Sequence, residues 1–128
     1  MKFLLDTHTL LWAVLSPTSL SRKAAKVIVD ETNLVLVSAA SAWEIATKVR
    51  IGKLPGAEIL EKNFLDVMED AGYTLLPIDA ADALRAGRLT GEHRDPFDRM
   101  IAAQAIARDI PVLSNDTRLD TFDLRRIW

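Results

Sequence analysis

Hydrophobic residues along this chain fall into two patterns that alternate from one end to the other. Short continuous apolar runs, which predict buried β-strands, cover residues 3–5, 34–37, 73–78 and 110–113, with a short fifth run at 124–127. Between these runs, apolar residues recur at helical spacing and predict α-helices over residues 9–15, 21–30, 41–50, 57–71, 79–88 and 96–108.

Apolar strands that alternate with helices are typical of βαβ units, in which the strands pair in parallel. The sequence therefore predicts an α/β fold: a single three-layer domain over residues 1–128, with a central parallel sheet of about four to five strands and helices on both faces. In such a fold the carboxyl ends of the strands and the amino ends of the helices share one edge. Ligands bind at that edge, so functional side chains are expected there.

The composition is that of an ordinary globular protein, with 49% hydrophobic and 27% charged residues. The absence of cysteine excludes disulfides, thiolate metal sites and cysteine nucleophiles. Asp6 interrupts the first apolar run too early for the core of a signal peptide, and no apolar run approaches the roughly 18 residues of a membrane span. We therefore expect a soluble, cytoplasmic protein.

The net charge argues against a nucleic-acid-binding protein. It is −2, with a pI of about 5.6, whereas nucleic-acid-binding domains are usually basic. A cluster of carboxylates lowers the pI of the chain. A divalent cation bound to that cluster would nevertheless neutralise its negative charge locally. Basic residues also occur in local groups, among them Lys48, Arg50 and Lys53, so the net charge does not decide the function.

Four acidic residues belong at the ligand-binding edge of the predicted sheet. Asp6 and Asp116 follow strands, whereas Glu44 and Asp98 fall in the first turn of predicted helices. Three of the four also have a purely structural interpretation. Asp6 and Asp116 are each placed to cap the helix that follows, and Glu44 would complete a capping box with Ser41 and pair with a lysine four residues further on.

Asp98 carries the strongest signal of the four. Asp95 precedes Pro96 and is the natural N-cap, which leaves Asp98 at the third helical position, in register with the apolar stripe of the helix. A buried carboxylate is costly unless it is paired or coordinated, so Asp98 is expected to bind a metal or, alternatively, to pair with a buried arginine. Asp79 lies at the same edge but forms an ordinary N-cap arrangement with Asp82.

The histidines and large aromatic residues have simple structural interpretations. His8 is expected to be exposed or to be satisfied within the core, and His93, in a polar loop, is expected to face solvent. Trp12, Trp43 and Phe97 are predicted to lie in the core rather than to form a platform for stacking bases.

Four segments resemble, in order, the motifs of VapC-type PIN domains, the toxin halves of bacterial toxin–antitoxin pairs. They are residues 6–12 (DTHTLLW), 41–45 (SAWEI), 94–105 (RDPFDRMIAAQA) and 113–116 (LSND). The third segment is quite specific, and together the four span nearly the whole chain. Asn115 stands at a position where such motifs vary.

This resemblance implies that Asp6, Asp98 and Asp116 are metal-site acids, with Glu44 completing a catalytic quartet. It leaves the two capping residues Asp79 and Asp95 outside the site. Carboxylates without cysteine or paired histidine favour a hard ion, Mg²⁺ or Mn²⁺. The expected activity is hydrolysis of an RNA phosphodiester by a metal-activated water. The resemblance also implies a small antitoxin as partner and a homodimer.

The basic residues after Glu44 have two interpretations. Lys48, Arg50 and Lys53 are candidate RNA-phosphate contacts, but cations at a helix C-terminus are also favourable for structural reasons alone.

Two other classes of function are compatible with the fold. A degenerate PIN-fold module would bind without cleaving, although all four acids are present. An aspartate-dependent phosphotransfer domain also places an acid after its first strand, but it needs a second acid close to Asp6, and residues 3–5 and 7–9 supply none.

Overall fold

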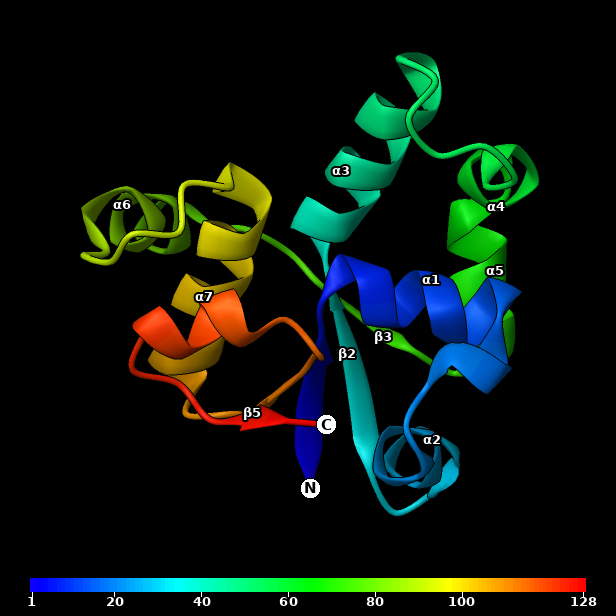
Figure 1. Ribbon diagram of the computed structural model, residues 1–128, viewed down its shortest axis with the longest axis horizontal. Coiled ribbons are helices and arrows are strands. Elements are labelled where there is room, and N and C mark those ends of the chain that lie inside the picture. Colours follow the sequence, from blue (N-terminus) through cyan, green and yellow to red (C-terminus); the bar gives the residue numbers. More distant parts are fainter.

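The computed structural model describes residues 1–128 and contains one sheet of five parallel strands. The strands are β1 (Lys2–Leu5), β2 (Leu34–Ser38), β3 (Thr74–Leu76), β4 (Val112–Leu113) and β5 (Arg126–Ile127). Their order across the sheet is β3-β2-β1-β4-β5, so β1 lies at the centre (Figure 1). Leu5, the last residue of β1, lies beside Val37 of β2 and Leu113 of β4. The parallel sheet confirms the predicted fold class.

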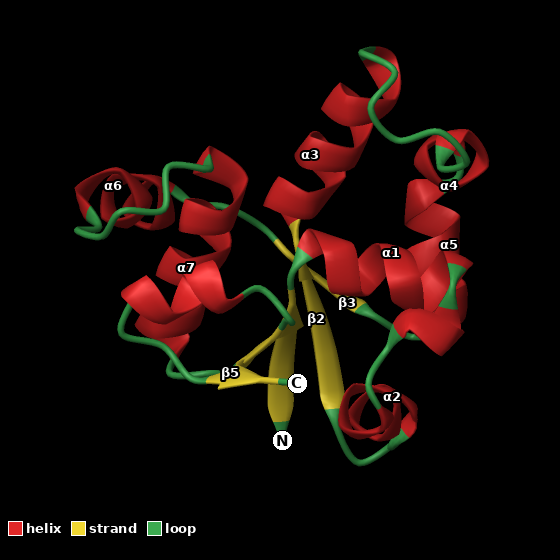
Figure 2. Ribbon diagram, viewed as in Figure 1, coloured by secondary structure: helices red, strands yellow, loops and turns green.

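Seven α-helices and two 3₁₀ helices connect the strands, and their bounds are α1 (Thr7–Leu15), η1 (Pro17–Ser19), α2 (Arg22–Val29), α3 (Ala39–Arg50), α4 (Glu58–Lys62), α5 (Phe64–Ala71), α6 (Ala80–Arg88), α7 (Pro96–Arg108) and η2 (Thr117–Thr121). Figure 2 shows α6 and α7 on one side of the sheet and α1, α2, α4 and α5 on the other. None of the helices combines the length and the apolar character that a membrane crossing requires.

Successive residues of β1 supply the two hydrophobic cores on the opposite faces of the sheet. Leu5 packs in a cluster with Leu10 of α1 and Met68 of α5. Leu4 packs in a second cluster with Ile101 of α7. Both leucines are completely buried, as expected for a parallel strand covered on both faces. This double cover holds the carboxyl ends of β1 and β4 in fixed positions under the helices that follow them.

The single helix predicted over residues 57–71 is wrong, because the chain forms α4 and α5 with a break at Asn63. Asn63 leaves helical geometry (φ −112°, ψ 24°). Its side-chain amide donates to the carbonyl of Ile59 at 2.9 Å. Asparagine side chains compete in this way with the backbone hydrogen bonds of a helix, and the apolar periodicity continues across the break without revealing it.

Candidate metal centre

The first of the four predicted acids, Asp6, follows β1 directly and is 4% exposed. Its Oδ1 accepts from the backbone N–H of Thr9 at 2.8 Å, which makes it the N-cap of α1. Its Oδ2 accepts from the Ser114 hydroxyl at 2.5 Å. Capping therefore explains one oxygen of Asp6, and a hydrogen bond from the loop after β4 orients the other.

Glu44 is in the second turn of α3 rather than the first, which corrects the predicted position. The helix begins at Ala39, and its cap is Ser38, whose hydroxyl accepts from the backbone N–H of Ala40 at 3.0 Å. The expected capping box between Ser41 and Glu44 is therefore absent. The chain turns directly from β2 into α3. Residues 38–40, which the apolar pattern assigns to a loop, therefore form the end of the strand and the start of the helix.

The Glu44 carboxylate is 3% exposed and only half satisfied. Its Oε2 pairs with the Lys48 ammonium, as the i, i+4 spacing predicts. Its Oε1 is buried and has no hydrogen-bond partner. A buried carboxylate oxygen without a donor costs free energy, so Oε1 is chemically suited to a ligand that the protein itself does not supply.

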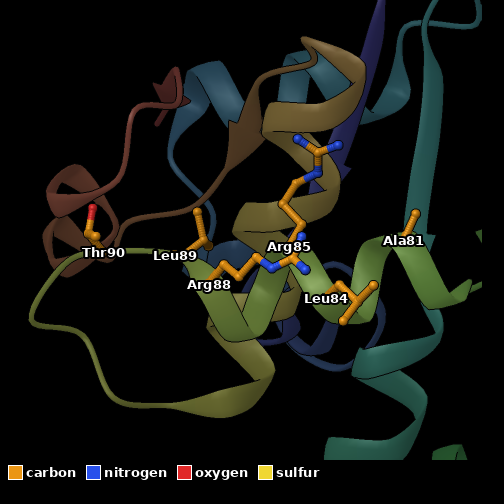
Figure 3. A pocket seen from close by; sticks show the side chains of 6 residues that line it. All are labelled: Ala81, Leu84, Arg85, Arg88, Leu89 and Thr90. Carbon is orange, nitrogen blue, oxygen red and sulfur yellow. The ribbon is translucent and has the colours of Figure 1, made fainter.

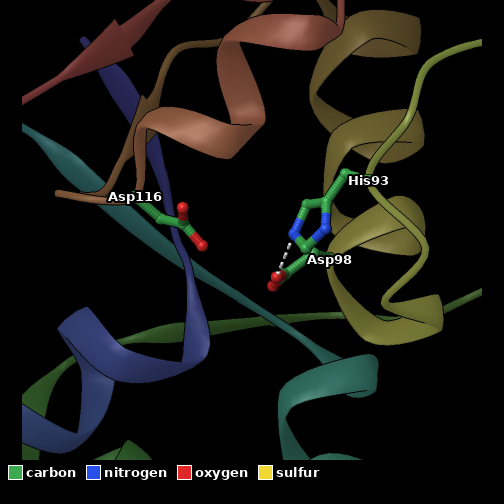
Figure 4. A group of neighbouring side chains, drawn as sticks. All are labelled: His93, Asp98 and Asp116. Carbon is green, nitrogen blue, oxygen red and sulfur yellow. Dashed lines mark hydrogen bonds and ion pairs between the residues drawn. The ribbon is translucent and has the colours of Figure 1, made fainter.

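Asp98 forms a hydrogen bond with His93 rather than pairing with a buried arginine. The His93 Nε2 lies 2.7 Å from the Asp98 Oδ2, and the Asp98 side chain is 15% exposed (Figure 4). Burial raises the pKa of the Asp98 carboxyl to about 6, and the negative charges of Asp95, Glu44 and Asp6 add to the rise. The hydrogen bond from His93 acts in the opposite direction. Asp98 therefore lies within electrostatic reach of both Glu44 and Asp6.

His93 was predicted to face solvent, and this prediction is wrong. Its side chain is 5% exposed. The loop that carries it folds back onto α7, where the Arg99 guanidinium donates to the backbone carbonyls of Leu89 and His93. No periodicity or spacing within residues 89–95 signals this contact, because Arg99 belongs to the next helix. Only the folded loop brings the imidazole to Asp98.

Asp116 is the N-cap of η2 and forms a two-pronged ion pair with Arg118, with a shortest distance of 2.8 Å. This hydrogen bonding holds the pKa of the Asp116 carboxyl below its usual range. Ligand atoms of Asp116, Asp98 and His93 all lie within 4.8 Å of one another. In Figure 4 the Asp116 carboxylate, which lies on the loop after β4, points toward the side chains of His93 and Asp98.

The residues at this edge fit a divalent cation. The candidate donors are carboxylate oxygens, the ligands that suit Mg²⁺ and Mn²⁺, and the His93 imidazole already bonds to Asp98. Oε1 of Glu44 lacks a donor, and burial together with neighbouring carboxylates raises the pKa of Asp98, so a bound cation would stabilise both groups. The two other edge aspartates, Asp79 and Asp95, cap α6 and α7 as predicted.

Replacing His93 with alanine is expected to raise the pKa of Asp98 above about 6, because the hydrogen bond that lowers it is lost. Fewer molecules would then carry an ionised Asp98 at pH 6.5, so Mg²⁺ should raise the melting temperature less than in the wild type. The difference should shrink at pH 8, where Asp98 is ionised in both proteins. Carboxyl NMR titration and thermal melts measure the two effects. His8→Ala, at an exposed histidine, is the control, and an unchanged Asp98 pKa would contradict the prediction.

The basic residues predicted to contact RNA lie at the end of α3 and in the turn beyond it. Lys48 already pairs with Glu44 and is 28% exposed. Arg50 and Lys53 are exposed, and neither forms an ion pair. The structure thus leaves two of the three cations free for another partner.

Comparison with known proteins places this arrangement in context. The family model described as "PIN domain" matches residues 3–124. A segment of 55 residues is 44% identical to Ribonuclease VapC16 of Mycobacterium tuberculosis (strain ATCC 25618 / H37Rv), covering 43% of this chain and 39% of that protein's length.

Solved structures share the fold over nearly the whole chain. VapBC2 from Rickettsia felis, bound to a promoter DNA fragment, matches with a TM-score of 0.73 and 17% identity, covering 99% of this chain and 98% of that one. VapBC-5 from Mycobacterium tuberculosis, a member of the VapBC family of toxin-antitoxin systems, matches with a TM-score of 0.64 and 20% identity, covering 98% of both chains. FitAcB from Neisseria gonorrhoeae matches with a TM-score of 0.61 and 19% identity, covering 98% of this chain and 96% of that one.

Proposed function

This chain belongs to the PIN domain family, and from that premise we propose that it is a metal-dependent ribonuclease, with Asp6, Glu44, Asp98 and Asp116 as its metal-site and catalytic acids. The single observation that carries the proposal is the buried Glu44 Oε1 without a donor, within electrostatic reach of an Asp98 carboxyl whose pKa is raised to about 6. The segment that matches a protein named as a ribonuclease supports the reaction class.

In the proposed mechanism the four acids would hold Mg²⁺ or Mn²⁺, and the bound ion would supply an activated water and stabilise negative charge on the phosphate and leaving group. The chain's own residues orient the acids. Ser114 fixes Oδ2 of Asp6, and His93 fixes Oδ2 of Asp98. Lys48 and Arg118 compensate Glu44 and Asp116 in the metal-free protein. These contacts give each carboxylate a defined orientation before any ligand arrives, which is the preorganisation that catalysis requires.

The proposal is tested by RNA cleavage with and without a divalent ion. Activity should require Mg²⁺ or Mn²⁺ and stop with EDTA, and the ion should raise the melting temperature because it binds only the folded acid cluster. Asp66→Asn, at an exposed acid of α5, should change neither result. Full cleavage in chelator would overturn the metal chemistry, and metal-dependent RNA binding without cleavage would favour a non-catalytic PIN-fold module.

We further propose that the protein acts in the cytoplasm as the toxin of a toxin–antitoxin pair and forms a homodimer. The toxin role is supported by the likeness in fold to proteins solved as VapBC and FitAB assemblies. A small antitoxin would cover the acidic edge and place a cation among the carboxylates. Expression in a bacterial host should arrest growth, and Asp98→Asn should relieve the arrest. A wild-type protein that is harmless when expressed alone would contradict the toxin role.

Removing two exposed cations should flatten the salt dependence of RNA binding. If Arg50 and Lys53 contact phosphates, their double replacement by alanine lowers the slope of log K against log[salt] by about 1.4, at about 0.7 per contact with a single strand. Lys48→Ala should add less, because its ammonium is already paired with Glu44. Binding titrations over a range of salt concentrations measure the slope. Lys23→Ala, on the distant helix α2, is the control, and an unchanged slope in the double variant would assign the cations to helix stabilisation alone.

A further inference from the structure

Trp43 lies on the surface, although the sequence predicted it in the core. It directly precedes Glu44, one of the four acids (Asp6, Glu44, Asp98 and Asp116) that form the proposed acid cluster. Its side chain is 61% exposed, whereas Glu44, the next residue, is 3% exposed. Successive helical residues point about 100° apart, so α3 directs the carboxylate inward and the indole outward. Tryptophan combines a large apolar ring with a polar N–H group and is enriched at sites where proteins contact other molecules.

The Trp43 ring borders a cavity of about 220 Å³ between α3, α6 and α7. The cavity is lined by Trp43, Ile78, Ala86, Gly87, Pro96, Arg99 and Met100. Phe97 supports the indole from α7 in an edge-on contact, with ring centroids 4.8 Å apart and planes at 75°. Phe97 directly precedes Asp98, just as Trp43 directly precedes Glu44. Both aromatic residues therefore lie one residue from an acid of the candidate metal centre.

Gly87 lines the cavity without a side chain that would fill it. It is the penultimate residue of α6, where alanine would favour the helix more than glycine does. A Cβ added at Gly87 would meet no atom within 4 Å, and its backbone is not in the left-handed region. Neither packing nor backbone conformation requires glycine here. The residue does leave space free at the cavity, which a planar ring facing Trp43 would occupy.

The charges around the cavity favour a polyanion as its occupant. Arg99 is the single charged residue in the lining, and its guanidinium donates to the carbonyls of Leu89 and His93. On the same helix, α6, Arg85 and Arg88 are exposed and line a second cavity of about 470 Å³ (Figure 3). An apolar slot for a ring, flanked by arginines, matches single-stranded nucleic acid, whose bases stack on aromatic rings while cations contact the phosphates.

We propose that the cavity bordered by Trp43 and Gly87 binds one unpaired nucleobase of a single-stranded RNA, next to the phosphate held at the acid cluster. This inference rests on the proposed ribonuclease function and deepens it by assigning a binding site for one base of the substrate. Stacking on the indole holds the strand in place, and a base in a duplex, already stacked on both faces, does not enter.

The first test compares cleavage of a single-stranded oligoribonucleotide by several variants. Trp43→Ala should raise KM by about 5- to 150-fold, the loss expected for one stacked base, and Trp43→Phe should retain most of the affinity. Gly87→Leu fills the cavity and should weaken RNA binding while the melting temperature stays equal or rises, because leucine is the better helix former. Leu65→Ala, at an exposed leucine of α5, should change neither quantity.

The second test observes the indole directly. In Asp98→Asn, with Trp12 and Trp128 replaced by phenylalanine, Trp43 is the single tryptophan, and RNA is not cleaved. Excitation at wavelengths that Tyr73 does not absorb selects the Trp43 indole. A single-stranded oligonucleotide should quench its fluorescence, and a duplex or an oligonucleotide without bases should not. Quenching by the antitoxin or by self-association but not by RNA would overturn the proposal and assign the surface to a protein partner.

Failure of this inference is distinguishable from failure of the proposed function. A wild type that cuts RNA, together with a Trp43→Ala variant of unchanged KM, overturns the base site alone. A wild type that cuts no RNA under any metal condition overturns the ribonuclease function, and the fluorescence titration then still decides whether the cavity binds a base.

Discussion

Asp98→Asn is expected to reduce RNA cleavage by at least about 100-fold and to raise the melting temperature of the metal-free protein at the same time. Loss of a metal-ligating carboxylate explains the first effect, since even residues behind the ligands are worth about 10- to 100-fold. The second follows from the raised pKa, because a buried carboxylate held near like charges destabilises the apo fold. Asparagine keeps an oxygen that can accept from His93.

The pH dependence of this stability difference has a definite sign. The pKa of Asp98 is 3.8 in the reference state and about 6 in the folded protein, so the folded state binds the proton more tightly. The destabilisation is complete above pH 6, where it amounts to at most about 3 kcal/mol. It disappears as the pH falls from about 6 to about 4. Thermal melts of wild type and variant in EDTA over this range measure the difference, which should be largest near neutral pH.

Asp95→Asn is the matched control for Asp98→Asn. Asp95 Oδ1 accepts from the backbone N–H groups of Phe97 and Asp98, which is the capping role, and asparagine caps a helix about as well as aspartate. This variant should retain cleavage and should keep the rise in melting temperature with Mg²⁺. If Asp98→Asn still cuts RNA and Asp95→Asn does not, the assignment of the third metal-site acid is wrong.

Gln104→Leu is expected to have the largest effect on stability among polar substitutions, a loss of about 2–5 kcal/mol in the free energy of unfolding. Gln104 is completely buried. Its Oε1 accepts from the Ser38 hydroxyl at 2.6 Å, and its Nε2 donates to the Pro77 carbonyl at 3.0 Å and to Asp82 at 3.1 Å. Leucine has a similar volume but removes the hydrogen bond that each of these three groups forms with Gln104.

The same network explains why Asp82 tolerates burial. Burial works against its ionisation, but hydrogen bonds from Arg108 and Gln104 outweigh this and hold the pKa of Asp82 below its usual range. A lowered pKa stabilises the fold above the reference value of 3.8, and this contribution is lost as the pH falls below it. Gln104→Leu removes one of the hydrogen bonds that lower the pKa, so the variant should lose less of its remaining stability in acid than the wild type does. Urea unfolding at neutral pH and at a pH below 3.8 measures both effects. Arg88→Leu, a polar-to-leucine change at an exposed residue of α6, should shift the unfolding free energy by no more than about 0.5 kcal/mol. A loss that small in Gln104→Leu would contradict the network's role.

Much of the fold follows from local sequence signals. The apolar runs around Leu4 and Leu36 predict buried strands because parallel strands covered on both faces need continuous apolar sequence. Helix α7 has the predicted bounds, since Asp95 and Pro96 define its start by local capping chemistry. The Asp79 capping box is present for the same reason. These features depend on contacts within about four residues, and a sequence displays such contacts directly.

Other features depend on contacts between distant segments, and the tertiary structure alone decided them. The strand order β3-β2-β1-β4-β5 arises from pairing across the whole chain. His93 reaches Asp98 because Arg99 fixes the loop between them, and Trp43 is exposed because α3 starts at Ala39 and turns its indole away from the core. The sequence by itself determined most of the elements and the candidate acids, but not the break at Asn63 or the start of α3 at Ala39. Which side chains surround those acids was decided by packing, because side chains from segments far apart in sequence meet only after the sheet has formed.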